Sequence, residues 1–63
     1  MIEWTFHIFS NNCDHYTQDI HDALKMFYRW KKDNLCARLY LQIEIDEELQ
    51  EENCLLSYGD FPV

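Results

Sequence analysis

Residues 2–9 alternate between apolar and mixed positions, which is the pattern of a strand with one buried face. The apolar side carries four large side chains, Ile2, Trp4, Phe6 and Ile8. The opposite side carries Glu3, Thr5, His7 and Phe9. We therefore expect a half-buried strand at the start of the chain.

From about residue 13 to residue 32 the apolar positions recur at helical spacing. They form one stripe, made of Tyr16, Ile20, Ala23, Leu24, Phe27 and Trp30. Asn12 is expected to cap the helix, because its side chain can accept hydrogen bonds from free backbone N–H groups. Asn34 is expected to adopt the left-handed conformation that ends many helices. This pattern predicts a helix over residues 13–32.

Residues 36–46 give the clearest alternation in the chain, and residues 53–58 form a shorter apolar run. Both patterns predict strands. The residues between them are acidic, so we expect an antiparallel hairpin whose tip is a charged loop. Residues 59–63 contain the only Gly and the only Pro, and we interpret them as a turn and a short terminal arm.

The element order is therefore β-α-β-β, a single α+β domain over residues 1–63 with one helix packed on a three-stranded sheet. A helix between the first two strands predicts a right-handed crossover. The third strand lies either outside the second strand or between the first and second. The predicted core places one set of helical side chains, Ile20, Ala23, Leu24 and Phe27, on one set of strand side chains, Trp4, Phe6, Leu39, Leu41 and Ile43.

A chain of 63 residues buries only about 60% of its unfolded surface, so its margin of stability is small. An apolar content of 48%, including 16% aromatic residues, still predicts a folded domain rather than a disordered one. One helix covers one face of such a sheet and leaves the other face open. We expect self-association into a homodimer or incorporation into a larger assembly, because small cores rarely suffice alone.

The net charge is −7, and it is unevenly distributed. Residues 35–63 contain seven of the twelve carboxylates and one of the five cations. This balance argues against direct nucleic-acid binding, where cations supply most of the affinity, and against anionic membrane surfaces. It favours a protein partner with a basic surface.

Six carboxylates crowd into nine positions: Glu44, Asp46, Glu47, Glu48, Glu51 and Glu52. One interpretation is a solvated loop whose charges protect a sheet edge from aggregation. The other is an anionic patch that docks on a basic partner, including a surface that otherwise holds nucleic acid.

The open face of the sheet is the second candidate interaction surface. If Leu39, Leu41 and Ile43 face the helix, then alternation turns Arg38, Tyr40, Gln42 and Glu44 away from it. The first strand adds Thr5, His7 and Phe9 to the same face. Mixed aromatic and polar surfaces of this kind are typical of protein interfaces, so His7, Phe9 and Tyr40 are predicted partner-binding residues.

Three cysteines, Cys13, Cys36 and Cys54, cannot all pair within the chain, and no secretory leader pattern precedes them. We expect reduced thiols in a cytoplasmic protein. Cys13 and His15, near the predicted helix start, suggest an alternative function in metal or redox handling with a second thiol. The sequence lacks the paired C-x-x-C spacing of structural zinc sites, and we expect no metal, cofactor or catalytic residue.

The function that fits these patterns best is a small acidic, non-enzymatic protein-interaction domain. It is expected to bind and modulate a protein partner, by inhibition in particular, through the open sheet face or the acidic segment. Some phage-encoded inhibitors are similarly small and acidic, and this likeness rests on size and charge.

Overall fold

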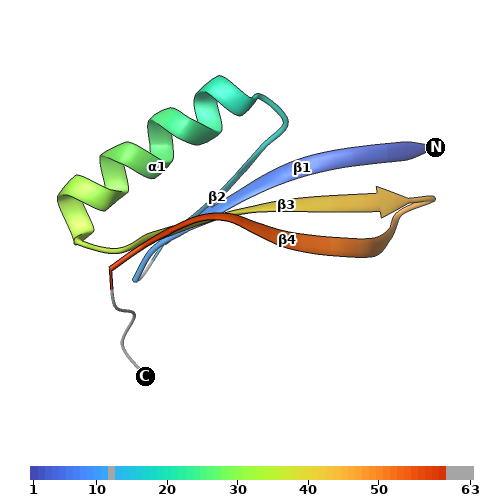
Figure 1. The fold of residues 1–63 in the computed structure, drawn as a ribbon. Coiled ribbons are helices and arrows are strands. Elements are labelled where there is room, and N and C mark those ends of the chain that lie inside the picture. The colour runs from blue at the N-terminus through green and yellow to red at the C-terminus, as the bar shows by residue number, and fades with distance from the viewer. Residues whose placement is uncertain (12, 60–63) are drawn as a thin grey trace.

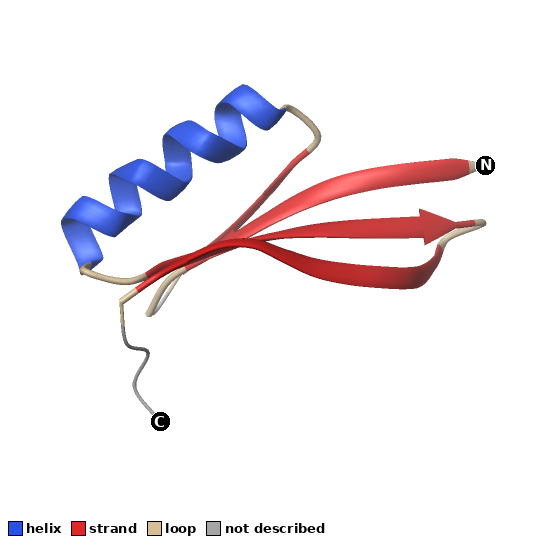
Figure 2. Cartoon of the chain, in the orientation of Figure 1, coloured by secondary structure: helices blue, strands red, loops and turns tan. Residues whose placement is uncertain are grey.

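The computed structural model describes residues 1–11 and 13–59, in which one helix packs on an antiparallel sheet (Figures 1 and 2). The elements in chain order are β1 (Ile2–Phe9), β2 (Asp14–Thr17), α1 (Ile20–Asn34), β3 (Ala37–Ile45) and β4 (Glu48–Tyr58). The strand order is β2-β1-β3-β4, and all neighbours are antiparallel. The predicted α+β class is confirmed, but the sheet has four strands instead of three.

The additional strand is β2, which occupies residues that the sequence pattern assigns to the helix. A tight connection leads into it, in which the backbone N–H of Ser10 donates to the carbonyl of Cys13 at 2.9 Å. Beyond it, Asp14–Thr17 pairs with the second half of β1. The predicted helix start at residue 13 is therefore wrong, and the proposed cap Asn12 lies outside the described residues.

Helix α1 begins instead at Ile20 and is capped by Asp19. The Asp19 carboxylate accepts a hydrogen bond from the backbone N–H of His21 at 2.9 Å, which satisfies one of the free donors of the first turn. The helix ends where Leu35, with φ of 61°, takes the left-handed conformation expected of Asn34. Lys31 and Lys32 occupy the last turn, where the helix dipole favours cations.

The crossover predicted between β1 and β3 is wrong, because these two strands are antiparallel. The helix instead joins β2 to β3, which are both antiparallel to β1 and therefore parallel to each other, with β1 between them. The third predicted strand, now β4, lies outside β3 and forms one edge of the sheet.

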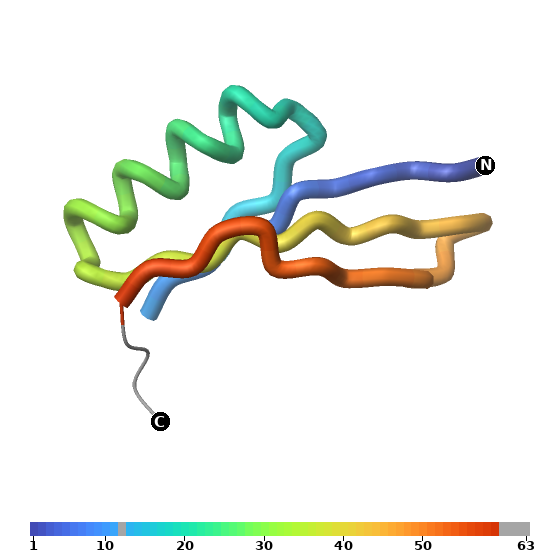
Figure 3. Tube along the Cα trace, in the orientation of Figure 1, coloured from blue at the N-terminus to red at the C-terminus, as the bar shows by residue number. Residues whose placement is uncertain are grey.

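The hairpin between β3 and β4 closes through two residues, Asp46 and Glu47, and not through a long acidic loop. Both have positive φ, 52° and 70°, as a type I′ hairpin turn requires. Strand β4 therefore begins five residues earlier than predicted. It contains two register shifts that leave Gln50 and Leu55 as extra residues, and Figure 3 shows that its path bends sharply.

The core lies between α1 and the half of the sheet in which β2 pairs with β1. It consists of five buried side chains, Ile8, Ala23, Phe27, Ala37 and Leu39, with Phe6, Leu24, Met26, Trp30 and Leu56 packed against them. The predicted core positions Ala23, Phe27 and Leu39 are confirmed. Ile20 and Trp4 are wrong, because they are 39% and 56% exposed. Their exposure follows from the late start of α1, which leaves the far half of the sheet uncovered.

Candidate functional site

Aromatic side chains cross the face of the sheet that is turned away from α1. We call Tyr16, His7, Phe9 and Tyr40 the aromatic row. The Tyr16 and His7 rings stack with their centroids 4.2 Å apart, and the Phe9 and Tyr40 rings stack at 5.4 Å. His7 and Phe9 lie 5.3 Å apart and connect the two pairs. The four rings therefore form one continuous surface over three strands.

The strand register explains why these rings meet. His7 lies directly opposite Tyr16 on one side and directly opposite Tyr40 on the other. Phe9 is two residues further along β1, and so projects from the same face. Directly opposed side chains have Cβ atoms only about 5 Å apart, which is close enough for rings to stack.

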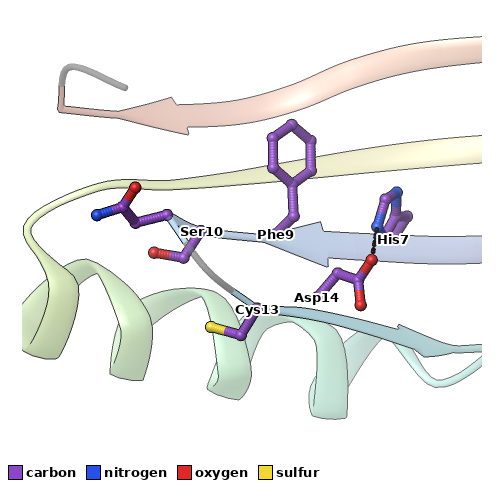
Figure 4. Close-up of a pocket in the computed structure, with 6 residues that line it drawn as sticks. His7, Phe9, Ser10, Cys13 and Asp14 are labelled. Carbon is purple, nitrogen blue, oxygen red and sulfur yellow. Dashed lines mark ion pairs between the residues drawn. The ribbon is translucent and has the colours of Figure 1, made fainter. Parts of the chain in front are cut away.

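An open pocket of about 360 Å³ adjoins the aromatic row (Figure 4). Its lining includes His7, Phe9, Ser10, Cys13 and Asp14. The Nε2 atom of His7 lies 3.6 Å from an Asp14 carboxylate oxygen, which is beyond hydrogen-bond length. This nitrogen is buried and has no hydrogen-bond partner among the described residues. A buried polar atom without a partner costs free energy.

Three carboxylates continue the open face toward the hairpin turn. We call Glu3, Glu44 and Glu52 the acidic patch. Glu3 and Glu44 are directly opposed across β1 and β3, an arrangement of like charges that destabilises a sheet. The side chain of Gln42 donates to the Glu52 carboxylate at 2.6 Å and holds it on this face. A cationic partner would relieve the repulsion between Glu3 and Glu44.

The remaining acidic residues are separated from this patch. Asp46 and Glu47 form the turn, while Glu48 and Glu51 lie opposite Ile45 and Ile43 on the side of α1. The extra residue Gln50 causes this division, because a bulge shifts the alternation of side chains by one position. The single acidic tip expected from the sequence is therefore wrong.

The structure brings five of the predicted partner-binding residues to one face: His7, Phe9, Tyr40, Glu44 and Glu52. The other four, Asp46, Glu47, Glu48 and Glu51, lie elsewhere. Sequence reasoning missed Tyr16 and Glu3. Glu3 shares the parity of His7 and could have been found by extending the alternation, whereas Tyr16 could be placed only by recognising β2.

Cys13 and His15 do not lie at the start of the helix, where the alternative function placed them. Cys13 precedes β2 and is exposed, so no helix N-terminus acts on its thiol. His15 lies 3.1 Å from the Asp22 carboxylate through its Nε2 atom. Hydrogen bonds from His15 and then Thr17 lower the pKa of Asp22. The His15–Asp22 pair links β2 to the first turn of α1, so a structural role explains it.

Within residues 1–11 and 13–59, no three His, Cys, Asp or Glu side chains are grouped so that they could hold a metal ion. In that same part of the chain, no helix has the length and apolar character needed to cross a membrane.

No protein-family model, curated protein or solved structure matches the chain.

Proposed function

We propose that this chain is a non-enzymatic protein-interaction domain that binds a basic protein surface through the open face of its sheet, and thereby modulates the partner. The observation that carries the proposal is that the aromatic row and the acidic patch occupy one continuous, uncovered face. Neither set of side chains is used by the core, which lies on the other side of the sheet.

The two halves of this face supply different parts of a binding free energy. Aromatic rings bury a large area with few rotatable bonds and are enriched among the residues that dominate interfaces. Carboxylates at the same face attract a cationic partner and raise its association rate. The rings therefore serve as anchors, and the acidic patch serves for steering and selection.

The thinness of the domain supports a binding role over catalysis. Small-molecule sites enclose most of their ligand, whereas a single helix on one side of a sheet builds no walls around the opposite face. Inhibition follows directly if the acidic patch occupies a partner surface that otherwise binds phosphates. The anionic side chains then act as an electrostatic substitute for nucleic acid.

A second copy of the chain is expected to cover the same face when no partner is bound. The aromatic row and the acidic patch lie at opposite ends of the strands. A twofold axis through the aromatic row would stack the rings and keep the acidic patches apart. Pairing through the β4 edge is less favourable, because three glutamates and two bulges interrupt that edge.

Affinity capture with matched variants tests this proposal. Immobilised wild-type chain is compared with Phe9→Ser/Tyr40→Ser, which removes two rings of the row, and with Tyr28→Ser, which removes an exposed ring of α1. A protein retained by the wild type and Tyr28→Ser, and lost from the double variant, is then purified and its affinity measured. Equal retention by all three folded chains would refute the assignment of this face.

A further inference from the structure

The sheet extends beyond the helix that covers it. Helix α1 has 15 residues and is about 22 Å long. If they were straight, the nine residues of β3 would extend about 30 Å and the eleven residues of β4 about 37 Å. Figures 1 and 2 show β1, β3 and β4 continuing past the start of α1 toward the N-terminus. Among residues 1–11 and 13–59, no element covers the α1 side of this extension.

Four apolar side chains occupy this uncovered area, and we call them the apolar patch: Ile2, Trp4, Ile43 and Ile45. They form two directly opposed pairs, Ile2 with Ile45 and Trp4 with Ile43. Ile2 and Trp4 are 59% and 56% exposed. Clusters of exposed large apolar side chains mark interaction sites more often than scattered ones do.

The edge of β1 beside the apolar patch is open. Strand β2 pairs only with the residues of β1 from Phe6 onward, so residues 2–5 have no neighbouring strand on that side within the described chain. A pocket of about 360 Å³ lies there, lined by Ile2, Glu3, Trp4 and Gln18. The apolar patch thus continues into a hollow between β1 and the segment that leads into α1.

Carboxylates border the apolar patch, and no lysine or arginine balances them. Glu48 and Glu51 lie opposite Ile45 and Ile43 on the same side of the sheet. Glu47 closes the end of the hairpin beside Asp46, which is paired with the N-terminal ammonium of Met1 at 2.7 Å. All five lysine and arginine residues of the chain fall between positions 25 and 38, so they belong to α1 and the start of β3.

We propose that the apolar patch binds an amphipathic helix that carries lysine or arginine beside its apolar stripe, docked beside α1. The strand length from Ile2 to Phe6 is about 14 Å, which accommodates a helix about 10–12 Å in diameter. The same side of the sheet already packs one helix. The acidic border selects a cationic helix, whereas a second copy of this chain would bring the same carboxylates against it.

This surface lies on the opposite side of the sheet from the aromatic row, so the inference does not depend on the proposed function. Adjacent residues of β4 point to opposite sides of the sheet, so neighbouring positions belong to different sites. Glu51 faces the apolar patch and Glu52 belongs to the acidic patch. Substitutions at these two positions therefore report on different surfaces.

The test uses the full chain and two fluorescein-labelled helical peptides that share a leucine stripe. One peptide has lysines beside the stripe, and the other has glutamates at the same positions. Fluorescence anisotropy should show binding of the lysine peptide alone. The indole N–H signal of Trp4 should shift in NMR spectra on binding, and that of Trp30, which packs against the core, should not.

Matched variants localise the binding. Trp4→Thr should weaken the lysine peptide about tenfold, as expected for an aromatic anchor. Tyr28→Thr should leave its affinity within about twofold, because Tyr28 is also 56% exposed but belongs to α1 and not to the apolar patch. Glu51→Gln should weaken binding more than Glu52→Gln does.

Three results would overturn the inference. The first is equal affinity for the lysine and glutamate peptides. The second is loss of binding in Tyr40→Ser but not in Trp4→Thr, which would place the peptide on the open face. The third is a stable dimer of the chain in which the Trp4 signal is shielded, which would make a second copy the occupant.

Discussion

Phe27 joins the helix to the sheet and is the largest side chain in the buried cluster. It is 4% exposed and packs among Ile8, Ala23 and Leu39. Because that cluster has only five members, each one carries a large share of the stability of the domain. A chain of this length is expected to be stable by only about 3–9 kcal/mol.

The variant Phe27→Ala should therefore lose about 3–5 kcal/mol and be largely unfolded. Trp4→Ala removes a larger side chain but should cost about 1 kcal/mol or less, because more than half of Trp4 is already in water. Urea unfolding followed by circular dichroism measures both. If Trp4→Ala proves as harmful as Phe27→Ala, the far half of the sheet is packed and the apolar patch is not exposed.

Asp22 gives the chain a local response to pH. Its pKa lies below the ordinary value of 3.8 because His15 and Thr17 hydrogen-bond to the carboxylate. A carboxyl group with a lower pKa in the folded state stabilises the fold above its unfolded pKa, and that contribution is lost as pH falls through the folded value.

Asp22→Asn should therefore lower the free energy of unfolding at pH 6 and reduce the loss of stability below about pH 4. The expected change is small, because the carboxylate is solvent-accessible and exposed pairs are weak. Urea titrations of both proteins at pH 6 and pH 2.5 measure the difference. An NMR titration that puts the wild-type Asp22 pKa above 3.8 would contradict the His15 contact.

At the scale of the elements, the β3–β4 hairpin is held in register by a turn with an unfavourable sequence. Asp46 and Glu47 both adopt positive φ, and left-handed conformations cost about 1–2 kcal/mol for residues other than glycine. Type I′ turns favour Asn-Gly or Asp-Gly at these positions. The chain therefore keeps a carboxylate at a position where glycine would be more stable.

Glu47→Gly should raise the free energy of unfolding by about 0.5–1 kcal/mol. Glu48→Gly is the matched control, because it removes the same charge one residue later, inside β4, where glycine weakens a strand. Thermal unfolding of the two variants should change in opposite directions. An equal effect of both substitutions would mean that relief of charge repulsion, and not turn geometry, determines the result.

The strands with regular alternation could be predicted from the sequence. The short strand β2 and the β-bulges, which interrupt that alternation, could not. Strands β1 and β3 are predictable because apolar residues recur at every other position over eight or nine residues. Strand β2 has only four residues, and its Tyr16 also fits a helical stripe with Ile20 and Ala23. Pairing with β1 decides between these interpretations, and that pairing is a tertiary effect.

The same distinction between regular and interrupted strands applies to the residues of the candidate site. His7, Phe9 and Tyr40 share one face because parity alone places them there. The acidic segment could not be resolved, because one extra residue at Gln50 sends Glu51 and Glu52 to opposite sides. Bulges depend on local backbone geometry and have no strong signal in a single sequence.

At the scale of the whole molecule, charge is separated along the strands. The domain measures about 36 × 26 × 17 Å. All five lysine and arginine residues lie in α1 and the start of β3, and the hairpin end carries six carboxylates. Such a distribution orients an approaching charged protein before contact and raises its association rate. The basic helix end is expected to face away from a cationic partner.

A thin domain with a small core would also gain stability from the proposed partner. Any ligand that binds only the folded state raises the apparent stability by mass action. The purified chain should therefore melt at a higher temperature in the presence of its partner, and the shift should increase with partner concentration. Differential scanning calorimetry with increasing partner concentration measures this effect. A melting temperature independent of partner concentration would show that the captured protein does not bind the folded chain.

The association rate with the captured partner, measured as a function of salt concentration, tests the central claim most directly. The wild-type rate should fall steeply as salt rises, because the acidic patch steers the encounter. Glu3→Gln/Glu44→Gln/Glu52→Gln should associate more slowly at low salt and depend less on salt. Tyr40→Ser should instead raise the dissociation rate and leave association nearly unchanged. A wild-type rate that is independent of salt and equal to that of the triple variant would contradict the assignment of the open face as a binding surface.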